Sequence, residues 1–218
     1  MVSLIHPSRG RPRQSFNNAR EWVAKAGVDV QLIVSVDQSD LTKMEYCELY
    51  QDYMQFRSLD SFLLNDNKSV VEASNVAARV SCGEILLYLS DDFKCFDNWG
   101  VEVESLMELD KPQLIKVDDM LQPFDRDVLT IPIMNRKLYE SLGYFWFPEY
   151  KSMWVDCDLA HVVKKMGVLK LCPELKFEHK HYSVGKAIKD KTYQQSDSNW
   201  DHGLEVFNRR KALGFPMN

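Results

Sequence analysis

The most informative stretch of this chain is an apolar run that ends in two acidic residues: Glu84-Ile85-Leu86-Leu87-Tyr88-Leu89-Ser90-Asp91-Asp92. The apolar part predicts a buried strand that delivers both carboxylates from its C-terminal end. In open α/β sheets, ligands bind at that edge. Two hard oxygen ligands there suit Mg²⁺ or Mn²⁺, which proteins usually share with substrate phosphates. An Asp-Asp pair alone is also compatible with a solvated turn, so the neighbouring segments must decide between the two interpretations.

The composition is that of a globular protein and disfavours several classes of function. A chain of 218 residues fits one domain. Its five cysteines are odd in number and include no C-x-x-C pair, which disfavours a zinc knuckle and a disulfide framework. A net charge of −5 argues against general binding of nucleic acid. Because no segment has the pattern of a signal peptide or a membrane span, we expect a cytoplasmic protein.

Hydrophobic periodicity predicts alternating strands and helices in the first half of the chain. The expected strands cover residues 2–5, 28–36, 59–64 and 85–89, and the expected helices cover 15–26, 69–81 and part of 41–57. Strands that alternate with helices favour parallel pairing and right-handed crossovers. We therefore expect an α/β fold with a mostly parallel central sheet flanked by helices.

The second half is less regular but continues the same architecture. Helices are expected at 99–109, 136–142, 155–166 and 198–213, and strands at 113–117, 128–134 and 168–171. Asn135 is the expected N-cap of the second of these helices, and Gly143 is its expected end. Residues 173–197 are polar and predict a loop. No repeat or linker divides the sequence, so residues 1–218 are expected to form one domain.

If the strands are parallel, four segments meet at one edge of the sheet. They are the turn at 7–12, the turn at Asp37, the Asp91-Asp92 pair and the residues that lead into the helix from Val155. A nucleotide needs a carboxylate for its base or ribose and a divalent cation for its diphosphate. A further carboxylate can take a proton from an acceptor hydroxyl.

In the order and spacing of these motifs, the sequence resembles the GT-A nucleotide-sugar glycosyltransferases, and most of all the large family-2 type. The resemblance rests on Pro7-Ser8-Arg9-Gly10-Arg11-Pro12, Val36-Asp37-Gln38-Ser39-Asp40, Asn75-Val76-Ala77-Ala78-Arg79, Ser81-Cys82-Gly83-Glu84 and Ser90-Asp91-Asp92. It implies a single GT-A (Rossmann-like) domain. Residues 1–98 would form the half that binds the nucleotide sugar, and residues 99–218 the half that binds the acceptor, with a C-terminal lid and helix.

The resemblance also implies which residues bind the donor and the metal. The donor would contact Pro7, Ser8, Arg9, Arg11, Asp37, Asn75, Arg79 and Asp91. Asp92 would bind Mn²⁺ or Mg²⁺ with His179, or with His181 as the second choice. The family motif is Asp-x-Asp, and this chain has Ser90 at the first position.

On the acceptor side, Asp156 matches the general base of the inverting members, and Val155 stands where the family has Glu. The alternative for Asp156 is a carboxylate that stabilises a helix N-terminus. Glu149, in Pro148-Glu149-Tyr150, matches the family's acceptor loop. Trp146 and Trp154 are candidates for stacking on a sugar or a base, and packing in the core or at the rim is the alternative for both.

The resemblance implies an inverting, metal-dependent hexosyl- or pentosyltransferase that moves a sugar from a nucleoside-diphosphate donor, most often a UDP-sugar, to an acceptor hydroxyl. A sugar-nucleotide nucleotidyltransferase and a non-catalytic nucleotide-binding module remain as alternatives. The acceptor could be a glycan, a protein, a small molecule or a modified nucleobase. A virus-encoded enzyme that glycosylates hydroxylated DNA bases in the host cytoplasm also fits such a chain.

Overall fold

A seven-stranded sheet forms the centre of the molecule. The computed structural model describes residues 1–55 and 57–217; residue 56, inside the segment expected to be partly helical, and residue 218 lie outside the described part. The strand order is β3-β2-β1-β4-β7-β6-β8, and only β7 runs against its two neighbours. The strands are β1 (Val2–Ser8), β2 (Val30–Asp37), β3 (Ser61–Asn65), β4 (Ile85–Tyr88), β6 (Leu114–Asp118), β7 (Ile133–Asn135) and β8 (Leu169–Lys176). The expected α/β fold with a mostly parallel sheet is confirmed.

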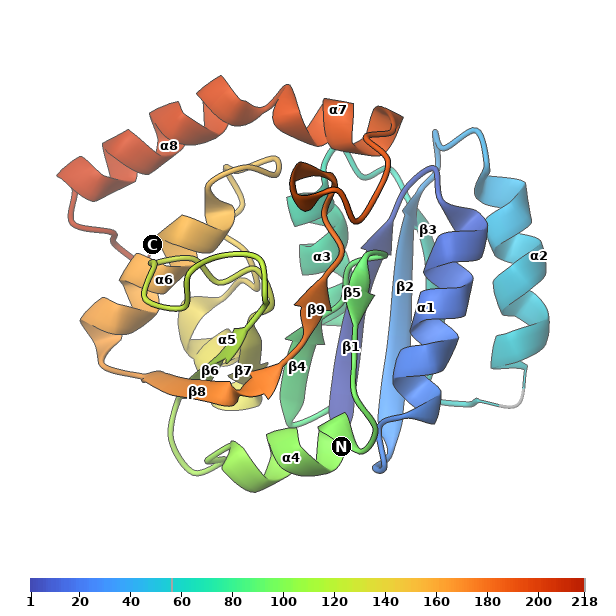
Figure 1. Ribbon diagram of the computed structural model, residues 1–218, viewed down its shortest axis with the longest axis horizontal. Helices are drawn as coiled ribbons and strands as arrows, with labels where there is room; N and C mark the ends of the chain where they lie inside the picture. The colour runs from blue at the N-terminus through green and yellow to red at the C-terminus, as the bar shows by residue number, and fades with distance from the viewer. Residues whose placement is uncertain (56, 218) are drawn as a thin grey trace.

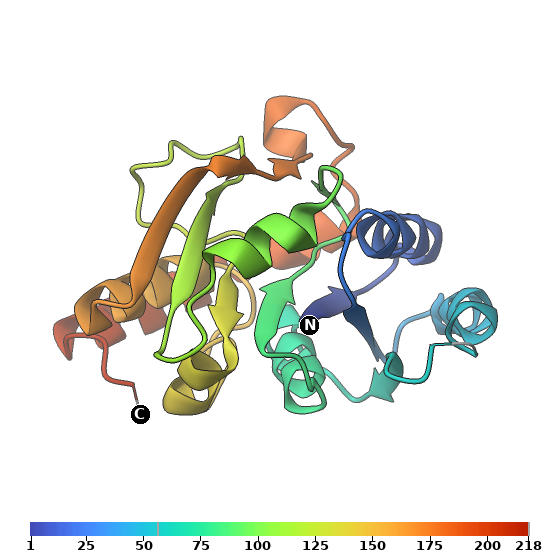
Figure 2. The ribbon, with the colours of Figure 1, turned by 90° about the horizontal axis from the view of Figure 1, so that it is seen from below.

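Helices cover both faces of this sheet. Figure 2 shows α1 and α4 on one face and α3 and α5 on the other, while α7 and α8 run across the top of the view in Figure 1. The helices are α1 (Pro12–Ala24), α2 (Lys43–Met54), α3 (Val70–Arg79), α4 (Trp99–Leu106), α5 (Arg136–Leu142), α6 (Val155–Met166), α7 (Lys191–Asp197) and α8 (Trp200–Ala212).

Each central strand is buried on both faces, because its side chains alternate between two hydrophobic cores. Leu4 of β1 belongs to the core that also contains Trp22 of α1 and Trp99 of α4. The next residue, Ile5, belongs to the core that contains Ala77 of α3 and Leu138 of α5. Strands without a polar face hold the sheet in the interior and leave only its ends free to bind a ligand.

Most helices and strands lie where local signals in the sequence predict them. The Asn135 side chain accepts a hydrogen bond from the Leu138 amide at 2.9 Å and begins α5, and Gly143 ends it with a φ of +75°. The expected strand at 128–134 is wrong in extent, since only β7 forms there. Residues 119–130 instead belong to the connection in which the Asp119 carboxylate accepts hydrogen bonds from the Leu121 and Gln122 amides.

The loop expected at 173–197 is wrong, because the segment contains four elements. Strand β8 continues through Pro173, which an edge strand tolerates. Strand β9 (Glu178–His179) then pairs with β5 (Phe93–Lys94), and the two lie side by side in Figure 1. A 3₁₀ turn, η1 (Tyr182–Val184), and α7 follow. Two-residue strands have no periodicity of their own, so the sequence does not reveal this pairing.

Within residues 1–55 and 57–217, no helix combines the length and the apolar character needed to cross a membrane.

Candidate functional site

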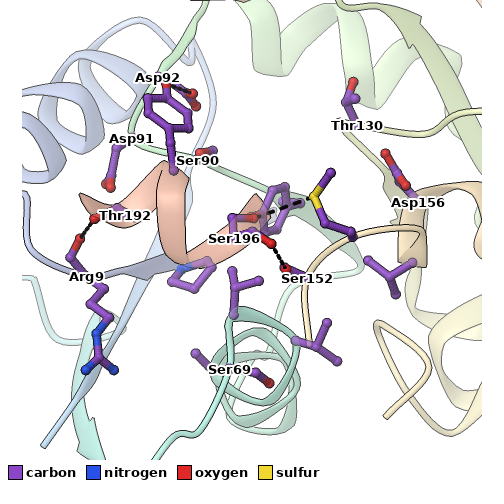
Figure 3. A pocket seen from close by; sticks show the side chains of 18 of the residues that line it. Arg9, Ser69, Ser90, Asp91, Asp92, Thr130, Ser152, Asp156, Thr192 and Ser196 are labelled. Atoms are coloured by element: carbon purple, nitrogen blue, oxygen red, sulfur yellow. Dashed lines mark hydrogen bonds between the residues drawn. The ribbon is translucent and has the colours of Figure 1, made fainter. Parts of the chain in front are cut away.

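A cavity of about 410 Å³ lies at the carboxyl ends of β1, β2 and β4. Parallel strands bring their ends to one edge, so residues far apart in sequence converge there. Ten of the residues expected at the site line this cavity: Pro7, Ser8, Arg9, Arg11, Asp37, Asp91, Asp92, Trp146, Asp156 and His179. Figure 3 shows the cavity with Arg9, Asp91 and Asp92 on one side and Asp156 on the other.

The β5–β9 pairing brings His179 to Asp92. Phe93 and His179 are partners in this ladder, and the Lys180 amide donates a 2.8 Å hydrogen bond to the Asp92 carbonyl. The His179 Nε2 then lies 3.3 Å from the Asp92 Oδ2. The Tyr193 hydroxyl donates to the same oxygen at 2.6 Å. Burial opposes ionisation of Asp92, but the hydrogen bonds and charge of His179 and the Tyr193 hydroxyl outweigh it and hold the pKa of Asp92 well below its ordinary value.

The donor atoms of this cluster fit a divalent cation that is shared with a ligand. Among the described residues, the buried Oδ1 atoms of Asp91 and Asp92 and the Nδ1 of His179 have no hydrogen-bond partner. An unpartnered buried carboxylate oxygen is costly unless something else satisfies it. In the same part of the chain, no three His, Cys, Asp or Glu side chains are grouped closely enough to hold a metal by themselves. Mg²⁺ and Mn²⁺ sites built from one or two carboxylates and substrate phosphates have this form.

Asp91 is buried beside Asp92 but in a different environment. Ser8 donates a 3.0 Å hydrogen bond to its Oδ2. Burial raises the pKa of Asp91 to about 7, although the Arg11 charge and the Ser8 hydrogen bond oppose the shift. The two adjacent carboxyls thus differ in proton affinity, and the ionised Asp92 is the better cation ligand.

His6 connects the segments next to the two aspartates, and its imidazole is neutral. Its Nδ1 must donate to the Leu89 carbonyl at 2.9 Å, so its Nε2 accepts from the Ser15 hydroxyl at 2.8 Å. Burial lowers the pKa of His6 to about 4. The side chain therefore ties the end of β1 to the residue that precedes Ser90, and it carries no charge toward Asp91 at neutral pH.

The turns after β1 and β2 are held together by hydrogen bonds. The Asp37 Oδ1 accepts from the Ser39 amide at 2.6 Å, and the Arg9 Nη1 lies 3.4 Å from its Oδ2. Asp40 accepts from the Gly10 amide at 2.7 Å. Gly10 has a φ of +68°, a conformation that favours glycine. Asp37 is thus presented at the cavity wall with a fixed carboxylate.

Arg11 is buried and already paired. Its Nε and Nη2 donate to the two oxygens of Asp190 at 2.7 and 2.8 Å, and its guanidinium lies 4.2 Å from the centre of the Tyr193 ring. A planar guanidinium forms this two-pronged contact with carboxylates and phosphates alike.

Helix α7 crosses the cavity and is attached at both ends. The Thr192 hydroxyl donates to the Arg9 carbonyl at 3.0 Å, and the Ser152 hydroxyl donates to the Ser196 carbonyl at 3.0 Å. Figure 3 shows both contacts as dashed lines. The helix therefore connects the turn after β1 with the segment that leads into α6.

Asp156 occupies the first turn of α6. It is half-buried, and its Oδ1 accepts from the Cys157 amide at 2.9 Å. Burial raises the pKa of Asp156, while the hydrogen bond from Cys157 opposes the shift. A carboxylate with a raised pKa is a stronger base than an exposed one, so this residue meets a chemical requirement of a proton acceptor.

Asn75 and Arg79 of α3 do not line the cavity. The Asn75 side chain instead accepts from the amides of Phe145 and Trp146 at 2.9 Å and donates to the Trp146 carbonyl at 2.8 Å. It thereby fixes the wall residue Trp146. Arg79 is exposed at the last turn of α3, whereas the first turn, at Val70, lines the cavity. The helix rise separates these turns by roughly 13 Å.

Glu149 and Trp154 also lie outside the cavity lining. Glu149 forms an ion pair with Arg209, and its carbonyl accepts from His202 of α8 at 2.9 Å. Trp154 packs against Trp200 and Phe207, with ring centres 5.0 and 5.2 Å away. Both residues hold α8 in place, and this agrees with the packing alternative for Trp154.

Several lining residues have no counterpart in the sequence prediction: Asn67, Lys68, Ser69, Gln122, Thr130, Thr192, Tyr193 and Gln195. Ser69 had a visible signal, since its hydroxyl accepts from the Glu72 amide as an N-cap. Asp190 caps α7 in the same way by accepting from the Tyr193 amide at 3.1 Å. Asp190 is thus a residue type that favours an N-cap, which is a local signal, but its contact with Arg11 is not encoded locally.

No model of a protein family matches the sequence, and no curated protein does. Solved structures do match it. The mannosyltransferase PcManGT from Pyrobaculum calidifontis, in complex with GDP-Man and Mn²⁺, superposes with a TM-score of 0.65 at 12% identity over 99% of this chain and 72% of its own. The chain has a GT-A fold.

Two further glycosyltransferase structures agree with that assignment. S. aureus TarS 1-349 in complex with UDP has a TM-score of 0.63 at 11% identity, over 81% of this chain and 59% of its own. GalNAc-T7 with UDP, GalNAc and Mn²⁺ has a TM-score of 0.64 at 13% identity, over 100% of this chain and 52% of its own. The chain thus spans between half and three fifths of the length of these two GT-A proteins.

Proposed function

We propose that this GT-A protein is a metal-dependent glycosyltransferase that uses a nucleoside-diphosphate sugar, with UDP-sugars as the first choice. The observation that carries the proposal is the pair of buried, unpartnered carboxylate oxygens of Asp91 and Asp92 in the cavity at the strand ends. Their cost in the free protein is offset when a cation and its diphosphate bind. The nucleotide and Mn²⁺ complexes of the three similar structures support the same choice of ligand.

The turns after β1 and β2 would bind the donor nucleoside. The Asp37 Oδ2, which lies beside the Arg9 guanidinium, would accept a hydrogen bond from the base or the ribose. Asn67 also lines the cavity. Pro7, Ser8 and Lys68 line it as well, and Lys68 adds a positive charge. The nucleoside end therefore combines a carboxylate acceptor with cations that suit a diphosphate.

Asp92 and His179 would hold Mn²⁺ or Mg²⁺, with Asp91 beside them. A bound cation would neutralise charge on the departing diphosphate. Asp92 is suited to this role because it is ionised and one of its oxygens is free among the described residues. His181 is 5.1 Å from His179 between ring centres, and its Nδ1 is paired with the Ser183 hydroxyl at 2.8 Å, which favours His179.

Asp156 would accept the proton of the acceptor hydroxyl. Its half-buried position across the cavity from Asp92 leaves room for a sugar between base and diphosphate (Figure 3). Removing that proton while the diphosphate leaves is a single displacement, so the anomeric configuration of the product would be inverted. Asp158, the other acid of this turn, is buried against Arg210 and cannot play this part.

Incubation of the protein with UDP- and GDP-sugars, with Mn²⁺ or with EDTA, tests the proposal. We expect free nucleoside diphosphate to appear only with the metal and to increase with a productive acceptor hydroxyl. Release of pyrophosphate from a nucleoside triphosphate and a sugar phosphate would indicate a nucleotidyltransferase. Nucleotide binding without any turnover would indicate a binding module.

A further inference from the structure

A short segment of the chain already contacts the groups that the donor would need. We call this segment the strap and define it as Asp190 together with α7, Lys191–Asp197. The strap is joined to the turn after β1 by Thr192 and to the α6 side by Ser196. Its residues Thr192, Tyr193, Gln195 and Ser196 line the cavity, and Figure 3 shows the helix running between the two attachments.

The first of these groups is the Arg11 guanidinium. Its side chain is 7% exposed and it lines the cavity, while the Asp190 side chain is 39% exposed. A buried guanidinium requires an anion, and Asp190 supplies both oxygens. A diphosphate offers the same arrangement of oxygens, so the two anions cannot use the same two N–H groups at once.

The second group is the Asp92 carboxylate. The Tyr193 hydroxyl donates to its Oδ2 at 2.6 Å, so one of the two oxygens is occupied while the Oδ1 is free in the described structure. The Tyr193 ring also covers the Arg11 guanidinium at 4.2 Å. One residue of the strap thus contacts both the cation that would meet the diphosphate and the carboxylate that would meet the metal.

We propose that the strap is an internal competitor of the donor diphosphate, in which Asp190 holds the place of a phosphate on Arg11. This inference rests on the proposed function. Donor binding must transfer Arg11 from Asp190 to the diphosphate, and the apparent affinity is reduced by the fraction of molecules in which the strap is attached. The remaining anchors, Thr192 and Ser196, are neutral hydrogen bonds that need not break when the anions exchange.

The variant Asp190→Asn tests this exchange. Asn is as good an N-cap as Asp, so α7 keeps its first turn and only the negative charge that faces Arg11 is lost. Asp197→Asn is the matched control: it removes the same charge from the same strap, but Asp197 pairs with Lys189 and Tyr182, whereas Asp190 pairs with Arg11. Calorimetric titration with UDP and with GDP, each in the presence of Mn²⁺, provides the dissociation constants.

We expect Asp190→Asn to lower the dissociation constant roughly three- to tenfold, because the strap no longer competes, and Asp197→Asn to change it less than twofold. A strap that only completes the donor site would give the opposite sign. Weaker or unchanged binding in Asp190→Asn would therefore overturn the inference while leaving the proposed function intact. If neither nucleotide binds to any of the three proteins, the proposed function fails and the inference fails with it.

Tyr193→Phe provides a second test that does not depend on the folding of the first variant. It removes only the hydroxyl that donates to the Asp92 Oδ2, the oxygen that His179 also approaches at 3.3 Å, and keeps the ring over Arg11. We expect nucleotide binding to reach half-saturation at a lower Mn²⁺ concentration than in the wild type. A higher Mn²⁺ requirement would mean that Tyr193 orients Asp92 for the metal, and the strap would not be a competitor at this position.

Discussion

Asp92 is the residue on which the proposed metal site depends. Replacement by Asn keeps an oxygen for the Tyr193 hydrogen bond but removes the charge, so we expect Mn²⁺-dependent binding of UDP to be lost. Asp97→Asn is the control, since Asp97 is exposed and contacts only the Lys25 ammonium among the ion pairs of the described residues. Calorimetry with Mn²⁺ and with EDTA measures the effect. Metal-dependent binding that survives in Asp92→Asn would refute the site.

Asp156 is the residue that the proposed chemistry needs in its ionised form. We expect Asp156→Asn to keep its affinity for UDP while sugar transfer falls roughly 10²–10⁴-fold. Because burial raises the pKa of Asp156, the base is protonated at a higher pH than an exposed carboxyl. Transfer by the wild type should therefore decrease as the pH falls through that raised pKa and level off above it. A pH–rate profile without this acid limb, or a product of retained configuration, would remove the role.

At the scale of elements, a buried ion pair joins α6 to α8. Arg210 donates to Asp158 at 2.6 and 3.2 Å, both side chains are at most 3% exposed, and the Tyr150 hydroxyl donates to the same carboxylate at 3.0 Å. Removing one partner leaves an uncompensated buried charge. We expect Arg210→Ala to lower the free energy of unfolding by about 3–5 kcal/mol in urea denaturation.

The neighbouring Arg209 is the control for that prediction. It pairs with Glu149 on the surface, where both side chains are about half exposed, so Arg209→Ala should cost about 0–1 kcal/mol. The pair of variants compares the same residue type on the same helix with and without burial. Equal losses of stability would show that α8 contributes through its packing and not through the ion pair.

At the scale of the whole molecule, donor binding should appear as added stability. A ligand present at ~100 times its dissociation constant stabilises the folded state by roughly 2.7 kcal/mol. For a chain of this size, each kcal/mol raises the melting temperature by roughly 2–4 °C. We therefore expect a shift of about 5–10 °C with the correct nucleotide sugar and Mn²⁺, and none in Asp92→Asn. A thermal-shift screen of UDP-, GDP- and other nucleotide sugars would also identify the donor.

The boundaries of most individual strands and helices follow from the sequence alone. Apolar periodicity placed β2, which ends at Asp37, and β4, which ends at Tyr88 shortly before Asp91, and an N-cap and a terminal glycine bounded α5 from Asn135 to Gly143. These signals are short-ranged, because the periodicity and the caps that define a strand or a helix involve residues only a few positions apart. Strand polarity then follows from the crossover rule, which brings the acidic strand ends to one edge. For this reason the fold, and the cavity positions of the acidic residues, were predictable.

Contacts between distant segments depend on the assembled fold. His179 reaches Asp92 through a two-residue ladder across 87 positions, and Asp190 reaches Arg11 across 179 positions. Four residues that the sequence predicted for the site do not line the cavity: Asn75, Arg79, Glu149 and Trp154. The direction in which a helix or loop presents a side chain depends on how that element packs. Such contacts are selected by the burial and charge of the assembled molecule, and no pattern within one segment of the sequence encodes them.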